Sequence, residues 1–359
     1  MNPRTGDGKA LRVVQWTTGN VGREAAKAVL AHPDLELVGC YAHGADKVGR
    51  DVGELCGVEP AGVVATDDVA ALLALQPDCV VYTALFPDID QQCRILEAGI
   101  NIVTSAAFVT GWGVGDEAKR RLDDAARRGG ASLFGSGMNP GFNNLLAIVS
   151  AGFSRRVDKV KLIESADASV QQSRETLEGI GMGLDTDDPE AARLAEAGSR
   201  VFGDGVCLVA DAMGWELDAI RCEPSFARAT EDIDLGWIRV DRGRIAGVNV
   251  RWLGMTGERC VVEFIGQYVL GTEFEPAWKI LHGWRVWVEG YPGVRTTLEV
   301  RPEGDTLERI AEDPNEFLAL GMSVVAVPIV NAIPAVCAAA PGIRTYLDLP
   351  PITSRGFRS

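Results

Sequence analysis

The chain has 359 residues, of which 47% are hydrophobic and 24% charged, and its formal net charge is −15. This length suits two domains with separate cores, and the composition is that of an ordinary globular protein. The acidic balance argues against general binding to nucleic acid or to an anionic membrane, both of which need clustered Lys and Arg. We expect no metal site, because the eight cysteines include no Cys-x-x-Cys pair and the three histidines are dispersed. The first nine residues contain no hydrophobic signal segment, which favours a cytoplasmic location.

Residues 11–32 are predicted to form a strand, a turn and a helix, which ends before Pro33. A glycine-rich turn at this position lets backbone N–H groups and the positive helix end face a pyrophosphate. The usual G-x-G-x-x-G pattern is altered here, since Thr17 occupies the position of the first glycine. We predict that the dinucleotide-binding turn consists of Thr17, Thr18, Gly19, Asn20, Val21 and Gly22.

Strands and helices alternate over the next hundred residues, which predicts a doubly wound parallel sheet. The expected strands cover residues 35–42, 60–64, 78–83, 101–105 and 131–134, and the expected helices cover residues 69–75, 89–97 and 116–128. From residue 151 onward the pattern changes to consecutive strands separated by turns. The expected helices there are 189–200 and 206–217, and the strands are 157–163, 237–240, 245–253, 258–269, 284–289 and 294–300. The fold class is therefore α/β, with an N-terminal Rossmann domain and a C-terminal α+β domain built on an open mixed sheet.

Residues 317–343 carry no charge and are long enough to span a bilayer. Interruptions at Gly321, Pro328, Asn331 and Pro334, and the lack of any other segment suited to a membrane bundle, favour a buried helix instead. We expect residues 1–150 to form the first domain, with 317–359 packing back onto it, and residues 151–316 to form the second.

Ligands of a doubly wound sheet lie at the carboxyl ends of its strands. An NAD-preferring site carries Asp or Glu about twenty residues after the last glycine, but that count from Gly22 reaches Ala42 and His43. The nearby cations His43, Lys47 and Arg50 favour the 2′-phosphate of NADPH, although they are equally explained as surface residues, and NADH remains an alternative. The remaining cofactor-binding candidates at strand ends are Thr83, Ala84, Thr104, Ser105 and Asn139.

A second distinctive stretch, residues 134–144, combines glycines, an Asn-Pro turn and uncharged polar side chains before an apolar helix at residues 145–151. Together with the aromatic residues after the strand at 101–105, it predicts an apolar substrate pocket. Its candidate residues are Phe108, Trp112, Met138, Phe142 and Asn143, and the alternative for the apolar ones is a place in the core.

Residues 13–23, 135–142 and 330–335 together resemble the dihydrodipicolinate reductase-like family. Within it the chain is similar to the branch of 2,4-diaminopentanoate dehydrogenase and native amine dehydrogenase. The resemblance implies a C-terminal domain that holds the substrate against the nicotinamide and mediates dimerisation, a homodimer, and NAD(P)H-dependent reduction of a C=N or C=O bond. The chain lacks the His-His-Lys-type substrate motif of true dihydrodipicolinate reductases, so we do not expect lysine-pathway activity.

A further departure concerns catalysis. Amine-forming members place a glutamate that activates ammonia just after the strand equivalent to residues 102–105, yet no carboxylate lies between Asn101 and Gly115. A ketone, an aldehyde or a preformed imine is therefore an alternative substrate. The candidate proton donors are His282, Glu164 and Asp167, with Ser165 and Thr104 as possible hydrogen-bond donors.

Two functions fit these observations. The first is an NAD(P)H-dependent oxidoreductase, similar to amine dehydrogenases, that acts on a small and mostly apolar molecule. The second is a non-catalytic dinucleotide-binding sensor or partner protein, suggested by the missing glutamate. We favour the enzyme because the C-terminal half has the length of a full substrate domain.

Overall fold

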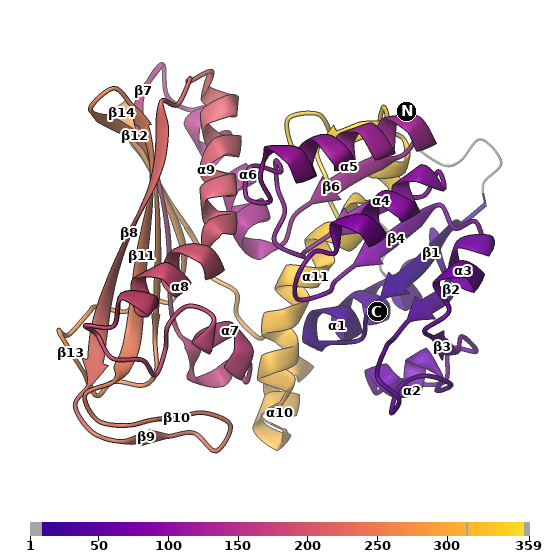
Figure 1. Ribbon diagram of the computed structural model, residues 1–359, viewed down its shortest axis with the longest axis horizontal. Coiled ribbons are helices and arrows are strands. Elements are labelled where there is room, and N and C mark those ends of the chain that lie inside the picture. Colours follow the sequence, from indigo (N-terminus) through magenta and orange to yellow (C-terminus); the bar gives the residue numbers. More distant parts are fainter. Residues whose placement is uncertain (1–8, 314, 355–359) are drawn as a thin grey trace. The chain divides into compact units, whose positions relative to one another are not determined.

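A computed structural model describes residues 9–313 and 315–354 of the chain (Figure 1). The chain divides into two compact units. Unit 1 contains the residues up to Phe142 and those from Glu308 onward, and unit 2 contains residues 143–307. Residues 143–150, which were expected in the first domain, group with unit 2.

Unit 1 is built on a seven-stranded sheet in which every pair of neighbouring strands is parallel. In spatial order the strands are β16 (Gly342–Arg344), β6 (Ser132–Gly135), β5 (Asn101–Thr104), β4 (Cys79–Tyr82), β1 (Leu11–Trp16), β2 (Leu35–Tyr41) and β3 (Ala65–Thr66). The strand order reverses between β1 and β4, where a doubly wound sheet opens a crevice for ligands. The predicted Rossmann sheet is confirmed. The short strand expected at 60–64 forms instead at β3.

Helices cover both faces of this sheet. Helix α1 (Asn20–Ala31) and helix α11 (Asn315–Cys337) share one apolar cluster with β1 and β2, while α3 (Val69–Ala74), α4 (Ile89–Glu97) and α5 (Asp116–Gly129) share another with β4 and β5. Burial of alanine and valine on one side of α1 explains why it packs closely on its neighbours. A short helix, α2 (Val52–Cys56), follows β2.

Helix α11, which the sequence predicts to be buried, is buried only in part. Its second half contributes Ala326, Ile329, Val330 and Ile333 to the core of unit 1, whereas its first half is partly exposed. Among the described residues it is the one helix whose length and apolar composition would allow it to cross a membrane, and about a third of its most apolar stretch is buried.

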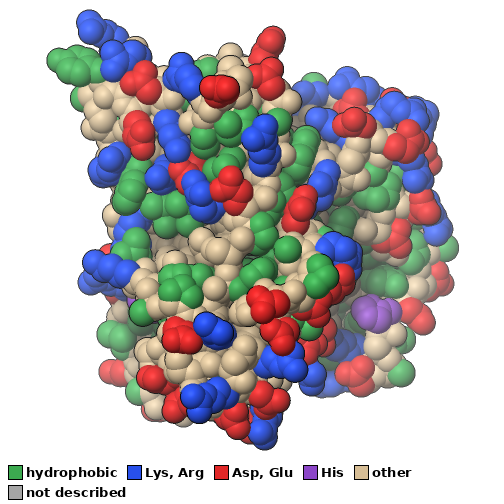
Figure 2. Space-filling view, turned by 60° about the vertical axis from the view of Figure 1, so that its left-hand side comes forward, with side chains coloured by type: hydrophobic (Ala, Val, Ile, Leu, Met, Phe, Trp, Pro, Cys, Tyr) green, Lys and Arg blue, Asp and Glu red, His purple; other side chains and the backbone are tan. Residues whose placement is uncertain are grey.

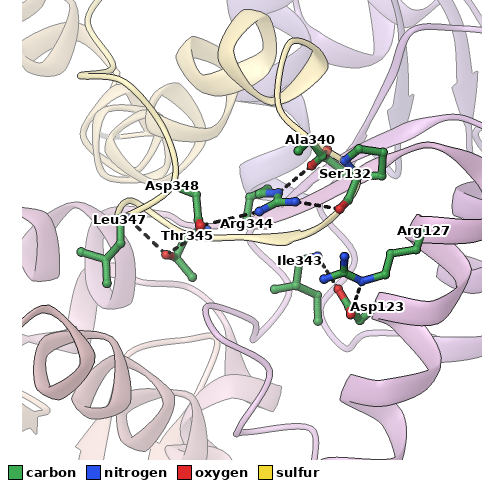
Figure 3. Close-up of polar contacts among 10 residues, drawn as sticks. Asp123, Arg127, Ser132, Ala340, Ile343, Arg344, Thr345, Leu347 and Asp348 are labelled. Carbon is green, nitrogen blue, oxygen red and sulfur yellow. Dashed lines mark hydrogen bonds and ion pairs between the residues drawn. The ribbon is translucent and has the colours of Figure 1, made fainter. Parts of the chain in front are cut away.

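The segment after α11 completes the sheet of unit 1 (Figure 3). Strand β16 pairs with β6, and Asp123 of α5 accepts a 2.9 Å hydrogen bond from the Ile343 N–H while it pairs with Arg127. The Arg344 side chain donates to the Ala340 carbonyl at 2.6 Å. The sequence analysis expected residues 317–359 to pack back onto the first domain, and residues 342–344 do so as a seventh strand.

Unit 2 is built on a second seven-stranded sheet with mixed strand directions, which confirms the predicted open mixed sheet. In order its strands are β13 (Phe274–Glu275), β8 (Ala219–Ala229), β11 (Ile245–Thr256), β12 (Arg259–Val269), β7 (Arg156–Asp167), β14 (Gly283–Tyr291) and β15 (Val294–Leu298). Only β12 and β7 run parallel. Helices α6 (Asn143–Ala151), α8 (Pro189–Gly198) and α9 (Arg200–Met213) contact one face, which we call the inner face. The smaller elements are α7 (Arg174–Glu178), β9 (Ile233–Asp234) and β10 (Arg239–Val240), and α10 (Asp305–Glu312) spans the end of unit 2.

The opposite, outer face of this sheet carries an ion-pair network around Glu263, which is 2% exposed. The Glu263 carboxylate lies 2.6 Å from Lys159 Nζ, 3.2 Å from Lys161 Nζ and 2.8 Å from an Arg251 guanidinium nitrogen. Figure 2 brings the strand-rich side of unit 2 forward and shows basic and acidic side chains interspersed. Charges of both signs on neighbouring strands of one sheet stabilise this face.

Strand β8 is absent from the sequence analysis, and helix α9 begins and ends before the predicted 206–217. Pro224 lies in the middle of β8, and proline normally argues against a strand because it cannot donate to the ladder. Strand β13 pairs with β8 only near Ala229, so Pro224 lies on an open edge where its missing N–H has no cost.

Candidate functional site

The turn after β1 keeps the backbone conformation of the glycine that it lacks. Thr17 has φ of +74°, in the left-handed region that favours glycine and is unusual for a β-branched residue. Its N–H donates to the Tyr41 carbonyl at 3.0 Å, which ties the turn to the end of β2. The altered motif therefore forms the same type of turn as the usual pattern.

The two glycines of the turn have different surroundings. A Cβ on Gly22 would stand 2.3 Å from the Thr17 carbonyl oxygen and 2.8 Å from Thr83 Oγ1, so only glycine allows α1 to start this close to the strand. A Cβ on Gly19 would have no described atom within 4 Å. Gly22 thus serves packing, while Gly19 opens the turn toward free space at the start of α1.

Side chains below the turn join the ends of β1 and β4. Gln15 Nε2 donates to the Thr17 carbonyl at 2.9 Å and to Thr83 Oγ1 at 2.8 Å, and the Thr83 hydroxyl donates to the Trp16 carbonyl at 3.0 Å. Both strand ends border the point where the strand order reverses. Gln15 was missed by the sequence analysis, because a glutamine inside an apolar strand gives no local signal for this role.

A pocket of about 300 Å³ lies in unit 1 beside the turn. Its lining residues are Thr18, Gly19, Asn20, Arg23, Asp46, Lys47, Arg50, Glu54 and Leu55. Lys47 and Arg50 were predicted here, and Arg23 adds a third cation whose guanidinium donates to Asn20 Oδ1 at 2.8 Å. Lys47 Nζ donates to the Thr18 carbonyl at 3.3 Å and so links the loop after β2 to the turn.

Two further residues near the turn are His43 and Asp51. His43 is absent from the pocket lining, and its ring lies 6.3 Å from that of Tyr41. Asp51 accepts hydrogen bonds from the N–H groups of Gly53, Ala61 and Gly62 at 2.7–2.8 Å, and these bonds, with that from Ala61 the largest influence, lower the pKa of its carboxyl. Asp51 thereby caps helix α2, which carries Glu54 and Leu55 of the pocket lining.

These residues fit the diphosphate and ribose of a dinucleotide. Thr18 Oγ1 and Gln15 Oε1 are buried polar atoms that have no hydrogen-bond partner within the described chain. The start of α1 presents backbone N–H groups beside Gly19, and anions bind favourably at such helix ends. Val21 packs against the apolar cluster below α1, which keeps the start of the helix in place.

The ends of β5 and β6 carry the other predicted residues of unit 1. Thr104 is fully buried and its hydroxyl accepts from the Ala106 N–H at 2.9 Å, while the Ser105 N–H donates to the Tyr82 carbonyl at 3.2 Å. Ala84, at the end of β4, packs against the apolar cluster around that strand.

The aromatic candidates divide between core and loop. Phe108 is 2% exposed and belongs to the apolar core beneath Gly135, whereas Trp112 is half-buried in the loop before α5. Met138 and Phe142 delimit an irregular turn in which the backbone of Asn139 is not helical, and the Phe142 N–H donates to the Gly137 carbonyl at 2.9 Å. The pocket role of these residues stays a prediction.

Asn143, at the start of α6 in unit 2, is fully buried. Neither its amide nitrogen nor its amide oxygen has a hydrogen-bond partner among the described residues. A buried amide normally pairs with a protein group, water or ligand, and this observation supports the predicted place of Asn143 in a substrate pocket.

The three predicted proton donors lie at the same end of the sheet of unit 2, with Glu164 and Asp167 on opposite faces of β7. Gly283, next to His282, pairs with Ser165, and Glu164 and Asp167 lie at the same end of β7. Asp167 is engaged in structure, since its carboxylate accepts from Ser169 Oγ at 2.6 Å and from the backbone N–H groups of Ser169 and Gly271. Glu164 instead accepts a 2.9 Å hydrogen bond from the Tyr268 hydroxyl, a partner the sequence analysis did not identify. No three His, Cys, Asp or Glu side chains gather as metal ligands in the described part of the chain.

Comparison with known proteins matches two successive parts of the chain to two domain families. Residues 13–131 match the N-terminal domain of dihydrodipicolinate reductase, and residues 142–355 match the C-terminal domain of 2,4-diaminopentanoate dehydrogenase. An amine dehydrogenase of Streptomyces virginiae is 30% identical over 95% of this chain and 96% of its own length. The chain belongs to the 2,4-diaminopentanoate dehydrogenase and amine dehydrogenase family.

Two further relatives agree with this assignment. The 2,4-diaminopentanoate dehydrogenase of Acetoanaerobium sticklandii is 24% identical over 95% of this chain and 93% of its own length. The solved structure of an amine dehydrogenase from Mycobacterium smegmatis has the same fold, with a TM-score of 0.75 at 23% identity over 96% of this chain and 97% of that one. The resemblance inferred from the sequence is confirmed, and the protein is an NAD(P)-dependent oxidoreductase of this family.

Proposed function

We propose that the protein is an NADPH-preferring, homodimeric oxidoreductase that reduces the C=O or C=N bond of a small and mostly apolar substrate. The observation that carries the cofactor preference is the pocket beside the turn, where Arg23, Lys47 and Arg50 face only two carboxylates, those of Asp46 and Glu54. No acidic residue occupies the end of β2, where a carboxylate would hold both ribose hydroxyls of NADH. A guanidinium and an ammonium group are the side chains that recognise a phosphate.

The cofactor, when bound, supplies the hydride that reduces the substrate. This chain then has to hold the diphosphate at the turn, orient the substrate and provide a hydrogen-bonding or proton-exchanging group beside the reacting heteroatom. The turn at Gly19 and the buried Thr18 hydroxyl support the first task. The uncharged loop at residues 136–142 and the buried Asn143 amide support the second.

A panel assay tests this function against the non-catalytic alternative. NADPH absorbance would be followed with cyclohexanone, pentan-2-one and benzaldehyde, each with and without ammonium chloride, and the Gly19→Ala variant would serve as the control with a blocked turn. We expect NADPH oxidation above background with at least one carbonyl compound, and slower oxidation by the variant at low NADPH concentration. Binding of NADPH without oxidation by any member of the panel would contradict the proposal and favour a dinucleotide sensor.

A further inference from the structure

The inner face of the sheet in unit 2 extends past the start of helix α9. Phe202, in the first turn of α9, stacks on Phe264 with ring centroids 4.2 Å apart. Four residues later in α9, Val206 lies against Gly254 of β11. Gly254 pairs with Val262, which is two residues before Phe264 in β12. Helix α9 therefore runs away from Tyr268, which follows Phe264 by four residues on the same face and lies roughly 13 Å further along β12.

Tyr268 and Glu164 form a hydrogen-bonded pair on this stretch. The Tyr268 hydroxyl donates to Glu164 Oε2 at 2.9 Å. Gly266, the neighbour of Glu164 in the parallel register, makes the contact possible, because a Cβ there would stand 3.2 Å from the Tyr268 hydroxyl and 3.1 Å from its ring. Burial and the charge of Glu164 raise the pKa of Tyr268 well above its usual value, so the hydroxyl stays a donor that holds the carboxylate in one orientation.

A second polar group lies on the other side of Glu164. Trp284 of β14 is its antiparallel register partner, which places the two Cβ atoms about 5 Å apart. The Trp284 indole N–H is buried and has no acceptor within the described chain. A buried donor that lacks an acceptor costs about 1–3 kcal/mol, and a ligand oxygen would remove that cost. The face thus offers a fixed carboxylate acceptor and an unused donor on adjacent strands.

Two other carboxylates of this sheet have structural roles. Asp167 caps the turn at Ser169, and Glu263 on the outer face is enclosed by three cations. The loop after β5, where the resemblance places the ammonia-activating glutamate, contains no acidic residue between Asn101 and Gly115. Glu164 accepts a hydrogen bond from the Tyr268 hydroxyl, which orients its carboxylate.

We propose that Glu164, oriented by Tyr268, binds the substrate nitrogen as a primary ammonium group, and that the Trp284 indole N–H binds an oxygen of the same substrate. An ammonium group offers three donors and a full positive charge, and its hydrogen bond to a carboxylate is among the stronger ones in proteins. The inference rests on the proposed function, because it names the amine side of that reaction. The nitrogen is then bound by a carboxylate of unit 2, since no acidic residue lies between Asn101 and Gly115.

Equilibrium binding to the NADPH-saturated protein tests this inference without turnover, since amine and reduced cofactor do not react. The probes are ammonium chloride, butylamine, cyclohexylamine and benzylamine, and each organic amine is compared with the alcohol of the same carbon skeleton by calorimetry. We expect the wild-type protein to bind at least one amine about tenfold or more tightly than its alcohol. Glu164→Gln should abolish this difference, and Tyr268→Phe should reduce it severalfold. Both variants should bind NADPH normally.

Glu289→Gln, the same chemical change at an exposed position of β14, is the matched control and should bind like the wild type. Glu164→Asp keeps the charge on a shorter side chain, and should retain part of the preference if Glu164→Gln folds poorly. Equal binding of every amine and its alcohol by the wild type, or an undiminished preference in Glu164→Gln, would overturn the inference. Failure of the wild type to bind NADPH in the same samples would instead contradict the proposed function.

Discussion

The turn of unit 1 and the inner face of unit 2 are built in opposite ways. The turn is contiguous, and its properties come from the backbone: a left-handed Thr17, an open Gly19 and a tightly packed Gly22. The proposed inner-face site joins Glu164, Tyr268 and other groups that are far apart in the sequence and meet only through strand register. Local sequence therefore encodes the cofactor class, whereas substrate recognition depends on how distant strands align.

The two glycines of the turn give the largest expected effects. Gly22→Ala would place a methyl group against the Thr17 carbonyl, so we expect a loss of roughly 2–4 kcal/mol in the free energy of unfolding. The same variant should lose NADPH affinity at least about a hundredfold, because the start of α1 must move away from the strand. Urea unfolding and a fluorescence titration measure the two quantities.

Gly19→Ala is the matched variant that separates packing from binding. Its methyl group meets no described atom and its φ of −71° is ordinary for alanine, so stability should stay within about 0.5 kcal/mol of the wild type. NADPH binding should still weaken about tenfold or more, since the methyl group would stand where the diphosphate approaches the backbone. Unchanged NADPH binding in Gly19→Ala would show that the diphosphate lies elsewhere. The turn of unit 1 would then not be the cofactor site.

Much of unit 1 can be predicted from the sequence because its strands and helices alternate with clear start and end signals. Asp88 caps α4 and Gly130 ends α5, and both boundaries follow from local chemistry. Strand β8 was missed because Pro224 masks an edge strand, and β16 because a three-residue strand has no periodicity of its own. Their pairing is decided by neighbours that are distant in the sequence.

The residues of the candidate site also divide into those that the local sequence predicts and those that only distant pairing brings together. Residues 17–22, Lys47 and Arg50 follow from motif position and charge, and the structure brings them to one pocket or its edge. Arg23 and Tyr268 were missed, the first because it reads as an ordinary helix residue and the second because only strand register joins it to Glu164. Asp167 was predicted as a proton donor, but its carboxylate caps the turn at residues 168–170. An aspartate in either role looks the same in the sequence.

The next prediction concerns Glu263, the buried carboxylate on the outer face of the sheet in unit 2. Burial alone would raise the pKa of Glu263, but hydrogen bonds from Lys159 and Arg251 and the charges of the lysines outweigh it and lower the pKa to about 2. Because the folded pKa lies below the unfolded one, the stabilisation is fully present above about pH 5 and is lost as the pH falls toward 2. We expect Glu263→Gln to lose about 2–3 kcal/mol near pH 7, and its deficit relative to the wild type to shrink below pH 4.5.

Urea unfolding at several pH values measures this deficit, with the exposed Glu289→Gln as the control. Amine binding by Glu263→Gln should stay normal, because Glu263 lies on the outer face. A stability deficit that is undiminished at pH 2.5, or a loss of amine preference in Glu263→Gln, would contradict this account. Glu263 would then not differ from Glu164 as a structural carboxylate differs from a ligand-binding one.

The cofactor pocket gives the smallest expected effect and the most direct test of the account. Trp16 is 1% exposed and directly precedes the turn, so its fluorescence is a natural reporter of cofactor binding. We expect the wild type to bind NADPH with a Kd in the micromolar range or below, about tenfold more tightly than NADH. The double variant Lys47→Ala, Arg50→Ala should lose this preference while NADH binding stays the same, and the exposed Arg94→Ala should behave like the wild type. Equal affinity for the two cofactors in the wild type, or an equal loss of both in the double variant, would contradict the assignment of this pocket to the 2′-phosphate.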